Sequence, residues 1–157
     1  MFIAMEVHSG TVGIYVRQAL TGMHAALDRF DNESVNRRPH GDRTNSAAGL
    51  VVHACAAATY WLEHVGLGRP VERDRDREFE ATATVVELRE LLAVTSDRLT
   101  TLAVEFDMGP TALDHEWRDS LNGGDTSDGS LVLHVLEELF QHLGHLELTA
   151  DAVNSAA

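Results

Sequence analysis

A glutamate and a histidine four residues apart, Glu138 and His142, are the most suggestive chemical pair in the sequence. They lie in a stretch whose apolar residues recur at helical spacing. Side chains at positions i and i+4 of a helix are about 5–6 Å apart at Cβ, so this carboxylate and this imidazole can bind one metal ion together. Both fall at the border of the apolar face of that helix. The spacing therefore suggests two ligands of a metal site; the alternative is an exposed Glu–His pair on the rim of a packed helix.

Two ligands do not complete such a site. Catalytic zinc centres use three protein ligands and leave a fourth position for water or substrate, and two histidines with one glutamate are a known set. His53 lies among apolar residues of another helical stretch, where a buried imidazole needs a partner. We therefore predict a site made of His53, Glu138 and His142, and the donor types favour zinc over nickel or iron.

Other reactive side chains receive simpler interpretations. Cys55 is a candidate nucleophile or fourth ligand. Because it lies two residues after His53, it falls on another face of the helix, and we expect it to be a buried core residue. His64 shares the stripe of His53 and is predicted to lie at its edge. His134 and His145 are predicted to face solvent. The run 114–116 (Asp-His-Glu) lacks helical spacing and is set aside.

Four amphipathic stretches must position these residues, and none of the chain alternates with the period of a strand. The connection over 66–81 is long enough to place the second and third helices parallel, although an up-down-up-down order also remains open. We expect an all-α fold, a four-helix bundle in one domain over 1–157, with fraying at 154–157. The helices are expected at about 11–30, 45–65, 82–106 and 130–150, and the buried face of the last is expected to hold Val132, Leu136, Leu139, Leu143, Leu146 and Ala150.

Composition excludes several classes of partner. The 157 residues are 44% hydrophobic, and 25 acidic against 12 basic residues give a formal charge of −13. Such a surface repels phosphate, so we expect no nucleic acid and no anionic membrane surface as partner. The sequence contains no run of 18 apolar residues, so we expect no membrane-spanning helix. The single cysteine and the lack of a signal-like N-terminus favour a cytoplasmic protein.

Three segments carry a resemblance to a known family: 45–53 (NSAAGLVVH), 75–79 (RDREF) and 137–145 (EELFQHLGH). With them the chain resembles the DinB-like four-helix superfamily, and within it the mycothiol-dependent group that includes the metal-binding domain of maleylpyruvate isomerase. Many superfamily members have histidine where this chain has Glu138, whereas the mycothiol-type members have glutamate. The resemblance implies an up-down-down-up bundle and the metal ligands His53, Glu138 and His142.

The same resemblance implies a function. It implies a mycothiol-type thiol S-transferase or thiol-dependent isomerase, in which a metal-bound thiolate attacks an electrophilic substrate. Arg75 matches an arginine near the metal and is expected to hold a carboxylate or the polar groups of the thiol, although a charge run such as 72–78 is more often a solvated loop. A homodimer is the expected assembly. The alternatives are a non-catalytic metal-binding bundle that acts through a ligand or partner, and a structural helical dimer with incidental histidines.

Overall fold

Four long helices dominate the structure, a computed structural model that describes residues 8–107 and 128–155. A 3₁₀ turn, Leu27–Arg29, prolongs the first helix, and a π-helical segment, Tyr60–Gly66, prolongs the second. Within the described ranges no strand occurs, and the expected all-α class is confirmed. The helices are α1 (Ser9–Ala26), α2 (Ala47–Thr59), α4 (Val85–Asp107) and α6 (Asp128–Ser155), with the short α3 (Arg75–Phe79) between α2 and α4.

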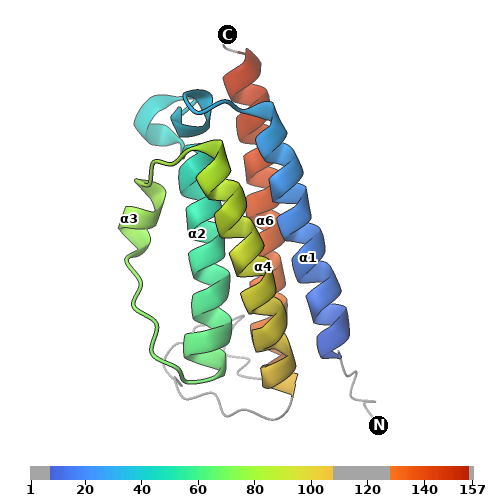
Figure 1. Ribbon diagram of the computed structural model, residues 1–157. Coiled ribbons are helices and arrows are strands. Elements are labelled where there is room, and N and C mark those ends of the chain that lie inside the picture. Colours follow the sequence, from blue (N-terminus) through green and yellow to red (C-terminus); the bar gives the residue numbers. More distant parts are fainter. Residues whose placement is uncertain (1–7, 108–127, 156–157) are drawn as a thin grey trace.

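The helices form a bundle with up-down-down-up order (Figure 1). Helix α1 runs upward in this view, α2 and α4 both run downward, and α6 returns upward. Both α1 and α2 pack against α4 and α6, so α1 and α2 lie on one diagonal of the bundle. The chain from the end of α2 climbs back along that helix, with α3 on its way, before α4 begins. This long return makes α2 and α4 parallel, as the length of the connection predicted.

Local signals explain where two helices start. Ser46 caps α2, because its hydroxyl accepts a hydrogen bond from the Gly49 amide at 3.1 Å. Thr84 and Glu87 form a reciprocal capping box before α4: the Glu87 carboxylate accepts from the Thr84 amide at 2.8 Å, and Thr84 Oγ1 accepts from the Glu87 amide at 3.2 Å. Helix α4 therefore starts at Val85, three residues later than periodicity alone predicted.

Small residues on α2 allow its neighbours to approach closely. Five alanines of this helix have side chains that are at most 1% exposed, and each side chain is too short to hold the facing helix away. The side chain of His53, on the same helix, is also buried. The five alanines are Ala47, Ala48, Ala54, Ala57 and Ala58.

The buried face of α6 differs from the prediction. Three residues of the expected stripe, Val132, Leu136 and Leu143, are only partly buried, while Leu131 and Val135 are completely buried. At 100° per residue, the observed face is rotated by about 40° from the predicted one. The reason is that α6 packs against α1 and α2 at the same time, so its contact surface is wider than one stripe.

The C-terminal end of α6 also corrects a prediction. The helix continues to Ser155, whereas residues 154 and 155 were expected to fray. The side-chain amide of Asn154 donates to the Arg29 backbone carbonyl at 3.3 Å, and the Arg29 guanidinium pairs with Asp151 at 2.5 Å. These contacts hold the last turns of α6 against the 3₁₀ turn that follows α1.

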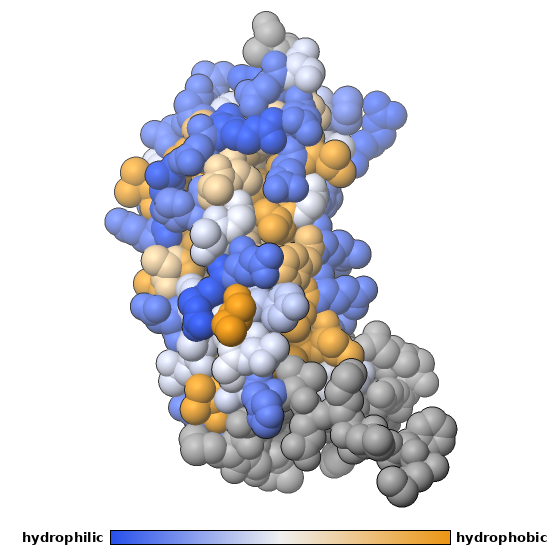
Figure 2. Space-filling view, turned by 90° about the vertical axis from the view of Figure 1, so that its right-hand side faces the viewer, coloured by the Kyte–Doolittle hydropathy of each residue, from blue (hydrophilic) through white to orange (hydrophobic). Residues whose placement is uncertain are grey.

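The outer surface is mixed in character. Seen from the side of α1, hydrophobic residues run down the molecule between hydrophilic ones (Figure 2). The exposed large hydrophobic residues of α1 and α6 are Ile14, Tyr15, Leu133 and Leu148. None of the helices in the described segments is both long enough and apolar enough to cross a membrane.

Candidate metal centre

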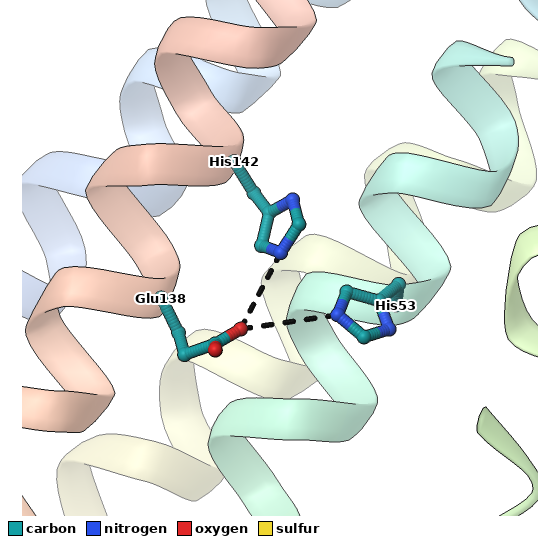
Figure 3. A group of neighbouring side chains, drawn as sticks. All are labelled: His53, Glu138 and His142. Carbon is teal, nitrogen blue, oxygen red and sulfur yellow. Dashed lines mark ion pairs between the residues drawn. The ribbon is translucent and has the colours of Figure 1, made fainter. Parts of the chain in front are cut away.

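Three side chains from two helices converge on one point. Glu138 and His142 project from α6 toward His53 on α2, and one oxygen of the Glu138 carboxylate faces both imidazoles (Figure 3). Glu138 Oε2 is 3.3 Å from His142 Nε2 and 3.8 Å from His53 Nε2. One ligand atom from each residue lies within 4.8 Å of the other two. The structure thus brings together all three of the residues predicted as ligands.

The distances suit a divalent ion. The ligand atoms of a tetrahedral ion with bonds near 2.1 Å are about 3.4 Å apart. This value falls between the distances from Glu138 Oε2 to the Nε2 atoms of His142 and His53. The hydrogen bond from His142 lowers the pKa of Glu138, whose carboxylate therefore stays ionised and able to bind a cation at neutral pH. Two imidazole nitrogens and one carboxylate form a donor set that binds zinc, nickel or iron.

His53 is the most rigidly held of the three. Only 4% of its side chain is exposed, and this burial lowers its pKa. Its Nδ1 lies 2.8 Å from Glu78 Oε2, and its ring stacks on Phe79 with centroids 4.1 Å apart. Phe79 can reach this position because residue 49 is a glycine: a Cβ there would lie 2.7 Å from the Phe79 carbonyl oxygen. The ring plane and the direction of Nε2 are therefore set by the segment around α3.

The three side chains form part of the wall of a cleft of about 590 Å³. The π-helical segment contributes Tyr60, Trp61 and His64 to it, and the connection before α3 contributes Arg73. An ion held by the three ligands would therefore face this cleft, which is large enough for a small-molecule substrate.

A family model described as mycothiol-S-transferase matches residues 12–154. The chain belongs to the mycothiol S-transferase family. This family is a member of the DinB-like superfamily, so the resemblance drawn from the sequence is confirmed. No curated protein and no solved structure matches the chain.

In this mycothiol S-transferase family member, Arg75 occupies the first turn of α3 at the edge of the cleft. Its guanidinium carbon lies 5.5 Å from the centre of the Phe79 ring. Its side chain is exposed, and no carboxylate in the part of the chain that the structure describes forms an ion pair with it. This position places its charge at the edge of the cleft.

Two residues that sequence reasoning missed lie even closer to the centre. Arg73 and Glu78 are the members of the charge run 72–78 whose side chains are not exposed. Arg73 Nε donates to Glu78 Oε1 at 2.7 Å, and its Nη2 donates to Oε2 at 3.0 Å. From the sequence, a charge run of this kind is more often a solvated loop than part of a site. Asp74, which caps α3 by accepting from the Arg77 amide at 3.2 Å, was the available signal that a short helix lies there.

The prediction that His134 faces solvent is wrong. Its side chain is 17% exposed, its ring packs edge-on against Trp61 at 4.6 Å, and it lines the cleft. Its Nε2 is 3.8 Å from Glu138 Oε1, the oxygen that does not face the other two ligands. The different packing of α6 accounts for this error, because it also brings the side next to Glu138 against the π-helical segment. His145 is exposed, as predicted.

The remaining candidates take no part in the centre. Cys55 is buried, and burial raises the pKa of its thiol to about 11, so the expected core role is confirmed. His64 accepts a hydrogen bond from the Val71 amide at 3.2 Å and stacks on Tyr60 at the edge of the cleft. The run 114–116 lies outside the described residues.

Proposed function

We propose that this protein is a divalent-metal-dependent mycothiol S-transferase whose ion is held by His53, Glu138 and His142. The observation that carries the proposal is the convergence of these three side chains on the wall of a cleft, in a chain of this family. Zinc is the ion we favour, because two histidines and one glutamate are a known catalytic zinc set.

The chemistry requires a thiolate at neutral pH. A bound divalent ion would supply it by lowering the pKa of the thiol. The sulfur then forms a bond to an electrophilic carbon of the second substrate, the leaving group departs with its bonding electrons, and the thiol proton passes to solvent. For this step the chain must keep Glu138 ionised and His53 uncharged. The lowered pKa values of Glu138 and His53 support these two conditions.

Substrate binding is assigned to the cleft. We propose that Arg75 holds an anionic or polar group of the thiol or of the electrophile, because its guanidinium is exposed at the edge and has no carboxylate partner among the described residues. The stacked Phe79 ring supports the guanidinium in this position.

A test combines metal analysis with turnover. Protein purified without chelators is analysed for zinc, nickel and iron, and the loaded protein is assayed with mycothiol, bacillithiol and glutathione against one model electrophile. We expect one equivalent of metal per chain, turnover with mycothiol, and loss of turnover after chelation that the same metal restores. Loaded protein that turns over no thiol would contradict the proposal.

Three further expectations accompany this proposal. They are one domain over residues 1–157, a homodimer, and a cytoplasmic location, and all three stay predictions. Light scattering of the purified protein measures its mass and tests the dimer.

A further inference from the structure

Glu78 is a buried carboxylate that the proposed reaction does not use directly. Its side chain is 8% exposed, and one of its oxygens, Oε2, lies 2.8 Å from His53 Nδ1. A carboxylate oxygen at this distance accepts a hydrogen bond from Nδ1 when the imidazole proton lies on that nitrogen. The other nitrogen of the ring, Nε2, is the one that faces Glu138.

We propose that Glu78 is a positioning residue that holds His53 in its Nδ1–H tautomer and thereby keeps the Nε2 lone pair free for the metal. A neutral imidazole carries one proton, and the hydrogen bond made by one nitrogen decides which tautomer is present. A histidine side chain in water favours the opposite tautomer, with the proton on Nε2, and that form cannot bind a metal through Nε2. The proposal rests on the proposed function for its metal, but the tautomer is a property of the metal-free chain.

Arg73 keeps the Glu78 carboxylate in the place that this role needs. Its guanidinium donates to both oxygens of Glu78, at 2.7 and 3.0 Å, which fixes the plane of the carboxylate. A buried ion pair of this kind adds little net stability, because the loss of hydration offsets the attraction between the charges. Its placement directly behind a ligand therefore points to a role in orienting His53.

Phe79, the next residue, restrains the same ring in another way. It stacks on His53 with an angle of 24° between the planes, and Arg38 holds the Phe79 carbonyl at 3.1 Å. The stack therefore restrains the plane of the imidazole ring, and the hydrogen bond to Glu78 distinguishes its two nitrogens. Together the two contacts direct Nε2 toward Glu138.

The test uses two variants and one control. Glu78→Leu and Glu78→Met both remove the acceptor at nearly constant size. Glu72→Gln removes the charge of an exposed carboxylate in the same connection. Circular dichroism confirms folding, and Glu78→Met carries the test if Glu78→Leu does not fold.

The first measurement is made on metal-free protein with ¹⁵N-labelled histidine, whose long-range ¹H–¹⁵N spectra distinguish the two tautomers; loss of a signal in His53→Asn assigns His53. We expect the Nδ1–H form in the native chain and in Glu72→Gln, and a shift toward the Nε2–H form in both Glu78 variants. The second measurement is zinc affinity by competition with a chromophoric chelator, which we expect to fall about 10–100-fold in the Glu78 variants only.

The results separate this proposal from the proposed function. If both Glu78 variants keep the Nδ1–H form and bind zinc as the native chain does, the positioning role is wrong, while zinc binding by the native chain still supports the metal centre. If the native chain binds no metal, the proposed function fails, and the positioning role toward a metal fails with it. A native His53 in the Nε2–H form would overturn the positioning role directly.

Discussion

The backbone of Phe79 crosses Gly49 so closely that a methyl group on residue 49 would lie 2.7 Å from the Phe79 carbonyl oxygen. Gly49 lies in the first turn of α2, one turn before His53, and Phe79 ends α3. This contact brings α3 against α2, and with it the aromatic ring and the carboxylate that hold His53. Gly49, which has no side chain, therefore allows α3 to approach α2 this closely.

A Gly49→Ala variant should be less stable than the native chain and should bind metal more weakly. The obstacle is backbone rather than a flexible side chain, so α3 has to move away, at a cost of about 1–3 kcal/mol. Urea denaturation measures the free energy of unfolding, and chelator competition measures metal affinity.

The control for this change is Gly144→Ala. Gly144 lies in the middle of α6, and a Cβ there would meet no atom within 4 Å. Alanine is favoured over glycine inside a helix by about 1 kcal/mol, so this variant should be more stable than the native chain. A Gly49→Ala variant that gains as much stability as Gly144→Ala would show that α3 adjusts to the methyl group without cost.

The proposed ligand set leads to a prediction for a second pair of variants. His142→Ala should lose bound metal, whereas His145→Ala should keep it, because His145 lies one turn along on the exposed side of α6. Removing one of three ligands should weaken binding by far more than tenfold. The measurement is metal content after dialysis, by plasma mass spectrometry. If the His142→Ala protein retains one equivalent of metal, His142 is not a ligand.

How much of this site was predictable depends on how each residue is placed. Glu138 and His142 lie one turn apart on a single helix, so their proximity follows from helical geometry, and His53 stands out as an imidazole in an apolar stretch. The resemblance to mycothiol-dependent proteins then pointed to the same three residues. Local periodicity and family pattern thus agreed on one set, and the structure brings its members within 4.8 Å of one another.

Arg73 and Glu78 were not predictable in the same way. They lie in a run of alternating charges without an apolar stripe, and nothing in such a run distinguishes a buried carboxylate from an exposed one. Their burial arises because the connection returns along α2, which is a tertiary effect. His134 was missed for a related reason: a single apolar stripe predicted the inner face of α6, whereas contacts with two helices and the π-helical segment widen it.

The buried thiol of Cys55 predicts a loss of stability at high pH. Burial raises the pKa of this thiol from 9.0 to about 11, so between these values the folded chain keeps a proton that the unfolded chain has lost. Stability therefore falls as pH rises through this interval, by about 2 kcal/mol. Urea denaturation at pH 8, 9, 10 and 11 measures this fall, and a Cys55→Ala variant should lack this part of it.

The same burial predicts that the thiol is inert. At pH 8, Ellman's reagent should react with Cys55 only as fast as the protein unfolds, and 6 M guanidinium, about the concentration that unfolds even very stable domains, should release the full reactivity. Rapid reaction of the folded protein would contradict both the burial and the raised pKa.

Arg75 should affect substrate binding without affecting the metal. Arg75→Gln removes the charge from the edge of the cleft, and a lost charged hydrogen bond of about 1.5–3 kcal/mol corresponds to a rise in KM of about 10–100-fold for the substrate it holds. Metal content and the free energy of unfolding should not change, because the side chain is exposed and its described contact is with one ring. Arg77→Gln is the matched control, since Arg77 lies in the same helix, is 84% exposed and pairs with Asp74. Measuring KM for the thiol and for the electrophile separately shows which of the two Arg75 contacts, and unchanged values for both would remove it from the binding site.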